Sequence, residues 1–194
     1  YDPEDPTPTV GGSLVSYVYP PGSVDVSEVQ SRPDVLVYTT APFDQDTDVV
    51  GRLSLTLYVG SDAPDTDFSV RISDVFPDGR AVQLVSNIVR ARYRDALPAL
   101  LETGKIYCLE IDLWATANRF FAGHALRLDI ASADFPKFDR NMNLGGAPGR
   151  PRTARQTIYH DAKHPSRLTI PVLRSGEQRR LGPEPSSDPH STAS

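Results

Sequence analysis

The chain has 194 residues, of which 39% are hydrophobic and 23% are charged, and its formal net charge is −5. This length suffices for one hydrophobic core with tails, and the composition excludes wholesale disorder. Charges of both signs are scattered along the chain and no apolar run is long enough to span a bilayer, so neither a nucleic-acid nor a membrane partner is expected.

The 18 prolines favour an all-β architecture, because proline is excluded from helix interiors and from central strands. The chain begins at Tyr1, and its single methionine is Met142, which suggests a cut or processed piece. A soluble protein is expected, with the cytoplasm as the default compartment. Residues 1–33 contain six prolines and are interpreted as an arm or linker.

Nine short segments that alternate apolar and polar residues follow the arm. They are residues 35–39, 51–59, 68–76, 81–85, 88–93, 106–114, 125–131, 156–160 and 167–172. The turn signal Pro77-Asp78-Gly79 joins the third and fourth of them in a hairpin. Residues 96–102 could make a short helical turn that Gly104 ends.

This succession of strands without a sustained helical period is typical of an antiparallel β-sandwich or jelly roll over residues 34–173. Residues 174–194 are rich in Ser, Pro, Glu and Arg, and we expect them to form a disordered tail.

Motifs for catalysis, metals and cofactors are weak in this chain. No Gly-x-Ser-x-Gly is present, so the nucleophile of an α/β-hydrolase is missing, and we expect no cofactor. His160 and His164 have a helical metal-ligand spacing, but Pro165 makes a helix there improbable, and a solvated turn is favoured. For His124 and Asp134 a structural role is favoured over a catalytic one, because no nucleophile is evident.

Asp62, Asp65 and Asp67 could in principle hold calcium, but they lack the register of an EF-hand, and an Asp-rich turn is the favoured interpretation. Cys108 lies in an apolar run and is predicted to be a small core residue. Trp114 is assigned to the core in preference to an exposed binding platform that it would share with Asn118 and neighbouring residues.

The segment that follows strand 125–131 is unusually aromatic and charged for a surface turn. Two phenylalanines, Phe135 and Phe138, flank Pro136, and Asp139, Arg140 and Asn141 come directly after them. Such a loop is expected to pack against something, and Arg140 could make a forked contact with a carboxylate or with carbonyl groups.

Several segments carry a family resemblance. DVLVYTT (34–40), APDTDF (63–68), VFPDGRA (75–81), IDLWATAN (111–118) and DFPKFDRN (134–141) together resemble the C-terminal domain of the X-prolyl dipeptidyl-peptidase and cocaine-esterase family, with coverage over residues 1–173. The resemblance implies a galactose-binding-like jelly roll appended to a serine α/β-hydrolase that cleaves X-Pro peptides, amino-acid esters or acyl amides. It also implies that the catalytic triad lies upstream, so no residue of this chain is assigned to catalysis.

Three functional hypotheses follow from these observations. The first is a non-catalytic module that packs on its own upstream hydrolase domain and shapes its cleft. The residues expected to dock are Trp114, Asn118, Phe135, Phe138, Asp139, Arg140 and Asn141, and a homo-oligomer through the sandwich stays open. The second is an independent module that binds carbohydrate or another small ligand. The third is a stand-alone hydrolase that uses His124 or His160.

Overall fold

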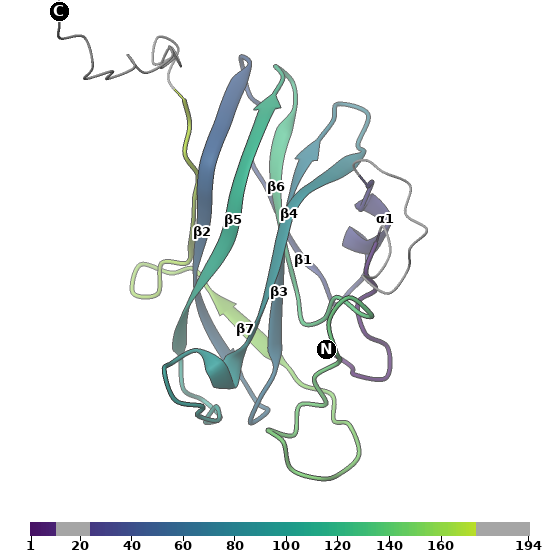
Figure 1. Ribbon diagram of the computed structural model, residues 1–194, viewed down its shortest axis with the longest axis vertical. Coiled ribbons are helices and arrows are strands. Elements are labelled where there is room, and N and C mark those ends of the chain that lie inside the picture. Colours follow the sequence, from purple (N-terminus) through teal and green to yellow (C-terminus); the bar gives the residue numbers. More distant parts are fainter. Residues whose placement is uncertain (11–23, 174–194) are drawn as a thin grey trace, which may run out of the picture.

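Two antiparallel sheets face each other in the computed structural model, which describes residues 1–10 and 24–173 (Figure 1). Sheet 1 has the order β1-β6-β3-β4, and sheet 2 has the order β5-β2-β7, with β8 also paired to β2. The strands of sheet 1 are β1 (Leu36–Thr39), β6 (Ala125–Ala131), β3 (Asp67–Val75) and β4 (Ala81–Arg90). Those of sheet 2 are β5 (Tyr107–Phe120), β2 (Thr47–Ser61), β7 (Gln156–Tyr159) and β8 (Arg167–Thr169). The prediction of an all-β sandwich is confirmed.

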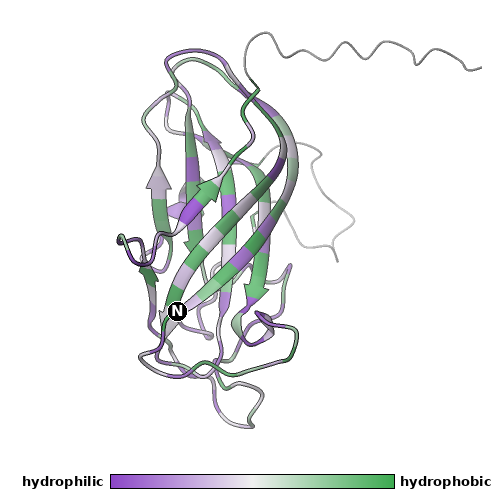
Figure 2. Ribbon diagram, turned by 90° about the vertical axis from the view of Figure 1, so that its left-hand side faces the viewer, coloured by the Kyte–Doolittle hydropathy of each residue, from purple (hydrophilic) through white to green (hydrophobic). Residues whose placement is uncertain are grey.

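The core lies between the two sheets and follows from the alternation of side chains along the strands. Every second residue of β2 and β5 faces inward, and apolar and polar residues alternate along the ribbons of Figure 2. The residues that fill the centre from both sheets are Leu53, Leu55, Leu57, Phe68, Val70, Ile72, Leu109, Ile111 and Leu113. Their burial supplies the main driving force for closing the sandwich.

Some element boundaries differ from those predicted. The segments predicted as two strands, 81–85 and 88–93, form one strand, β4, as far as Arg90, because Ser86 and Asn87, whose types favour turns, pair with Arg71 and Val70 of β3. The described residues therefore form eight strands rather than nine. The long strand β5 continues through Trp114 to Phe120, and β2 begins four residues earlier than expected.

The helical turn predicted over residues 96–102 is wrong. A short 3-10 helix, η1 (Ala91–Tyr93), lies just before it, and residues 96–102 form a loop. Pro98 disfavours the helical conformation of the residue before it, and only Leu101 of the three leucines is buried. Cys108 is also not a core residue: it lies on the exposed side of β5 beside Glu110.

The N-terminal segment packs on the outer face of sheet 1. A single helical turn, α1 (Ser27–Gln30), covers this face together with residues 1–10, although little regular structure was expected before residue 34. The backbone of Thr9 donates to the Phe135 carbonyl oxygen at 2.7 Å, so the arm is bonded to the loop that follows β6. The domain boundary at residue 34 and the finer jelly-roll assignment stay predictions, and the predicted tail, 174–194, lies outside the described residues, as does part of the arm.

The described part contains no helix long and apolar enough to cross a membrane.

Candidate docking surface at the loop end of the sandwich

Two long connections meet at one end of the sandwich, drawn at the bottom of Figure 1. One joins β4 to β5 and contains η1; the other joins β6 to β7 and spans residues 132–155. They touch: a Cβ built on Gly145 would lie 2.7 Å from Leu100 Cδ2, and one on Gly146 would lie 3.2 Å from Arg92 Nη1. Glycine at these two positions allows this close approach. We call this region the loop end.

A buried pair of carboxylates organises the loop end. Asp67 accepts hydrogen bonds from both Nε (2.9 Å) and Nη2 (3.0 Å) of Arg90. Asp65 accepts one from the backbone N–H of Arg92 at 3.0 Å. Asn141 bridges the two carboxylates, because its Nδ2 donates to Asp65 at 3.1 Å and to Asp67 at 2.7 Å. The carboxylates thus fix Arg90 at the end of β4, the backbone of Arg92 in η1 and the distal loop in one arrangement.

The electrostatics of this network reflect its burial. Burial raises the pKa of Asp67, and the hydrogen bonds from Arg90 and Asn141 counteract only part of that rise. The hydrogen bond to Asp67 raises the pKa of Arg90, so the guanidinium is charged throughout the physiological range. Burial, with a further contribution from Asp67, raises the pKa of Tyr1 to about 12. The network therefore combines a costly buried charge with a fixed cation that compensates it.

Three of the loop residues predicted to dock, Asp139, Arg140 and Asn141, line a hollow of about 290 Å³, whereas Phe135 and Phe138 do not. Asp139 is 80% exposed and accepts from Arg90 Nη2 at 3.0 Å, while Arg140 donates to the Pro3 carbonyl oxygen at 2.9 Å. Arg90, Arg92 and Arg140 all line this hollow. It presents hydrogen-bond donors that are already held in place.

Exposed apolar side chains stand beside the arginines. Tyr93, Leu97 and Leu100 are 56%, 78% and 49% exposed, and all three belong to the connection between β4 and β5. Arg94 stiffens this connection, because its Nη1 donates to the carbonyl oxygens of Ala91 (3.0 Å) and Ala99 (2.6 Å). An exposed apolar cluster on a braced loop is typical of an interaction surface.

The two predicted phenylalanines pack on the chain itself more than the sequence suggested. The backbone of Phe135 pairs with Thr7 and Thr9, and its ring lies 5.5 Å from the Arg140 guanidinium. Phe138 is half-buried beneath Lys137. The loop thus attaches the N-terminal segment to sheet 1, and Phe135, 39% exposed, still offers part of its ring to solvent.

Trp114 and Asn118 do not join the loop end. They lie on β5, and Trp114 is seven residues beyond Tyr107, where the strand begins, a distance of roughly 23 Å at the usual rise of a strand. The core assignment of Trp114 is wrong, because its side chain is 59% exposed. Trp114 follows buried Leu113 and takes the outward-facing position of the strand alternation, and a β-bulge opposite Leu53 gives it a φ of 64°.

The sequence-based prediction did not include five residues of the loop end: Arg90, Arg92, Tyr93, Leu97 and Leu100. The available signal was the run Arg90-Ala91-Arg92-Tyr93-Arg94, three arginines and a tyrosine directly after an apolar strand. The sequence favours an Asp-rich turn over a calcium loop here, and in the structure Asp65 and Asp67 bind arginine and asparagine. Among residues 1–10 and 24–173, no group of three or more His, Cys, Asp or Glu is placed to hold a metal ion.

Each of the three histidines in the described part of the chain lies beside an acidic or an aromatic side chain. His124 Nδ1 lies 2.9 Å from Asp74 Oδ1, and its ring packs 4.4 Å from that of Phe76. His164 pairs with Asp161 at 3.1 Å, and His160 lies against Tyr38.

Comparisons with known proteins show the family to which this sandwich belongs. Residues 4–169 match the family described as the X-Pro dipeptidyl-peptidase C-terminal non-catalytic domain. The chain is 42% identical over 181 residues to the cocaine esterase of Rhodococcus sp. (strain MB1 Bresler), covering 90% of this chain and 32% of that protein. It therefore spans about a third of that relative's length.

Two solved structures are similar. An aminopeptidase from a marine sediment Thaumarchaeota archaeon gives a TM-score of 0.81 at 28% identity, over 89% of this chain and 32% of that one. An α-amino acid ester hydrolase gives 0.78 at 26% identity, over 89% of this chain and 31% of that one.

Fold and site together define a β-sandwich module of hydrolases, with an arginine-lined loop end. The chain belongs to the family of X-Pro dipeptidyl-peptidase C-terminal non-catalytic domains.

Proposed function

We propose that this domain packs through its loop end on an α/β-hydrolase catalytic domain and shapes the active-site cleft of that domain. The catalytic partner would be a serine hydrolase acting on X-Pro peptides, amino-acid esters or acyl amides. The docking contacts would come from Tyr93, Leu97 and Leu100 together with Asp139 and Arg140.

The observation that carries the proposal is the exposed apolar side chains beside the Arg90 guanidinium, which buried Asp67 holds in place. Aromatic and arginine side chains dominate the energetics of protein interfaces, and preorganised groups lose little entropy on binding. The relative that this chain matches is about three times as long as the chain, so it has room for a further domain of the kind proposed as the docking partner.

The test compares this chain alone with a protein in which it follows a hydrolase domain. The double variant Tyr93→Ser/Leu97→Ser removes exposed apolar surface only, so the melting temperature of the isolated chain should change by less than about 1 °C. In the two-domain protein, the same variant should lower the melting temperature by several degrees or split the transition in two. Differential scanning calorimetry measures both.

Val50→Ser is the matched control, because Val50 is also exposed, at 42%, but lies on β2. It should leave both melting curves unchanged. Equal effects of the Tyr93/Leu97 variant in the one-domain and two-domain proteins would contradict docking through the loop end, as would no effect in either.

A second candidate function rests on Trp114. An indole that is 59% exposed at positive φ is a strained arrangement, and beside it Asp112 is paired with Arg52 while its carbonyl oxygen accepts from Asn87 at 2.7 Å. An aromatic face next to fixed polar groups suits a sugar ring. A glycan screen by NMR should then give saturable shifts that Trp114→Ala abolishes and Phe121→Ala, another exposed aromatic, does not. Shifts insensitive to Trp114→Ala would contradict this role.

A further inference from the structure

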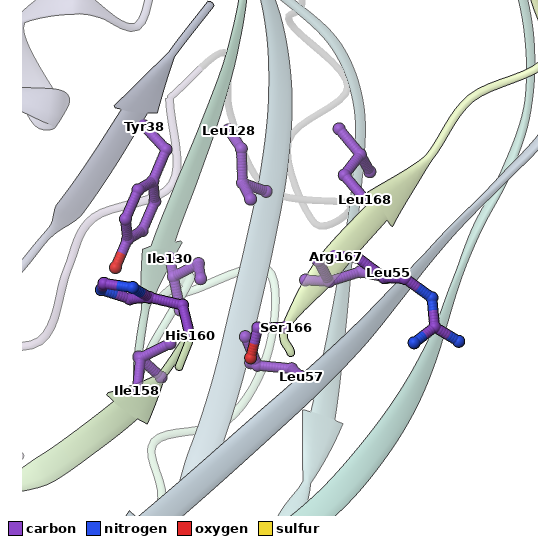
Figure 3. A pocket seen from close by; sticks show the side chains of 10 residues that line it. All are labelled: Tyr38, Leu55, Leu57, Leu128, Ile130, Ile158, His160, Ser166, Arg167 and Leu168. Atoms are coloured by element: carbon purple, nitrogen blue, oxygen red, sulfur yellow. The ribbon is translucent and has the colours of Figure 1, made fainter. Parts of the chain in front are cut away.

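The two sides of the sandwich close differently. On the β4–β5 side, Asn87 of sheet 1 donates to the Asp112 carbonyl oxygen of sheet 2 at 2.7 Å, which ties the sheets together. On the opposite side, between β1 and β7, the sheets leave an open cavity of about 320 Å³ (Figure 3). We propose that this cavity binds a small carbonyl or carboxylate compound with one aromatic ring or a medium-length alkyl chain.

The walls of the cavity are aliphatic and belong to paired strands. Six side chains from both sheets form them: Leu55, Leu57, Leu128, Ile130, Ile158 and Leu168. Leu55 and Leu57 are 1% exposed, and the cross-strand pairing of Leu55 with Ile111 and Leu168 fixes their positions. The cavity is therefore formed before any ligand arrives, as binding pockets commonly are.

Size limits the ligand. An apolar cavity of about 150 Å³ inside a protein accepts benzene, so a cavity of about twice that volume has room for a substituted ring or a chain of roughly eight carbons. Its volume also lies at the lower end of the range typical of small-molecule sites. A larger metabolite such as a nucleotide does not fit between the sheets.

Two polar side chains at the opening of the cavity determine where the polar end of the ligand binds. Tyr38 of β1 and His160, which follows β7, face each other across it, with ring centroids 6.3 Å apart and planes at 77°. In Figure 3 the Tyr38 hydroxyl points toward His160, whereas the Arg167 guanidinium points away from this pair. Among the described residues, neither the hydroxyl nor the imidazole has a hydrogen-bond partner, so both are available to donate to an acceptor oxygen.

The same two rings disfavour a protein partner in the cavity. They reach across the opening from sheet 1 and from sheet 2, while the deepest walls, Leu55 and Leu57, lie behind them almost without exposure. A flat protein surface cannot reach those leucines, but the cavity is open beside the two rings, and a slender ligand can enter it there. The cavity opens between β1 and β7, not at the loop end, so this site is independent of the docking proposed above.

The experiment is a methyl NMR titration of the 194-residue chain with 3-phenylpropionate and with octanoate. Saturable shifts are expected at Leu55, Leu57, Leu128 and Ile158, with a dissociation constant on the order of a millimolar for ligands of this size. His160→Ala should weaken carboxylate binding at least threefold and leave the fold intact, because the imidazole is exposed. Ile158→Phe should fill the cavity and abolish the shifts.

Val37→Phe is the matched control, because Val37 precedes Tyr38 on β1 and points to the opposite face of the strand. It should bind both probes as the parent chain does, and its spectrum shows that a new phenylalanine at this edge is tolerated. Non-saturating shifts, shifts outside the cavity, or unchanged binding by Ile158→Phe would overturn the proposal. So would a parent chain that dimerises through the cavity, seen as a mass in light scattering that Ile158→Phe halves.

Discussion

The two faces of β3 are both buried, but by different means. Toward sheet 2, Phe68, Val70 and Ile72 are at most 1% exposed and belong to the apolar core. On the other face, Arg71 lies 4% exposed between Asp129 at 3.4 Å and Asp134 at 3.7 Å, beneath α1 and the loop after β6. The face toward sheet 2 is buried by apolar packing, and the outer face is buried around a charged network.

On the charged face, the buried polar groups are not all paired. Arg71 Nε and Asp134 Oδ1 are buried without a hydrogen-bond partner among the described residues, and both ion-pair distances are long. Apolar packing tolerates small shifts, whereas a buried charge whose partner is lost keeps its whole desolvation cost. The outer face should therefore be the more sensitive to single substitutions, although it contributes less apolar burial.

The substitution Arg71→Met tests most directly whether the charged face is the more sensitive one. The substitution keeps the volume of the side chain but removes the buried cation from Asp129 and leaves Asp134 with Lys137 alone, at 3.8 Å. We expect a loss of about 3–5 kcal/mol in the free energy of unfolding, which corresponds to roughly 10 °C in melting temperature for a chain of this size. Urea denaturation followed by circular dichroism measures it.

Ile72→Val is the control from the other face, one residue along the same strand. Removing one methylene from the core should cost about 1 kcal/mol. If Arg71→Met proves no more costly than Ile72→Val, the charged face does not have the sensitivity that its geometry implies.

The apolar face of β3 could be predicted from the sequence, and the burial of its polar face could not. Period-2 alternation identified Phe68, Val70 and Ile72 as core residues, because a strand exposes every second side chain to the same side. The same pattern marks Ser69, Arg71 and Ser73 as solvated. Their cover comes from α1 and from the loop after β6, and no local signal indicates that these distant segments return to sheet 1.

The loop end was predicted in part for a similar reason. The aromatic and charged composition of residues 134–141 indicated a packed loop, and Asn141 is indeed buried. Its partners, Asp65 and Asp67, lie 76 and 74 residues earlier, and a single sequence gives no evidence of such long-range pairs. Trp114 was misplaced because large aromatic rings are usually buried, whereas its position directly after buried Leu113 puts it on the outer side of β5.

A smaller effect is expected from Gln30→Ala, which tests whether α1 is held by the outer network. Gln30 Nε2 donates to Asp129 at 3.0 Å and to Ser73 at 3.3 Å, and its Oε1 accepts from Arg127 at 3.0 Å. Removing the amide leaves buried groups unpaired, so a loss of about 1–3 kcal/mol is expected in urea denaturation.

Ser31→Ala serves as its control, because Ser31 is exposed and bonds only within its own turn. Amide exchange of the α1 backbone should accelerate in the Gln30 variant and not in the Ser31 variant. Equal exchange in the two would show that contacts other than Gln30 fix the helix.

The smallest effect is a pH slope, measured with Asp129→Asn. Burial is the main cause that raises the pKa of Asp129 above its ordinary value of 3.8, against the opposing charge of Arg71 and the hydrogen bond from Gln30. As the pH rises from 3.8 toward that raised pKa, the unfolded chain releases this proton first, so the contribution of Asp129 to stability falls. Asparagine has no such proton, and the stability of the variant relative to the parent should therefore increase through this window.

Asp48→Asn provides the opposite sign on the exposed surface. The hydrogen bonds from Arg119, at 2.6 and 2.8 Å, lower the pKa of Asp48, so its contribution is present above pH 3.8 and is lost as the pH falls through the lowered value. Relative to the parent, this variant should lose stability as the pH rises toward 3.8. Urea midpoints between pH 2.5 and 7 should thus give slopes of opposite sign for the two variants. Slopes of the same sign would mean that burial does not decide how Asp129 titrates.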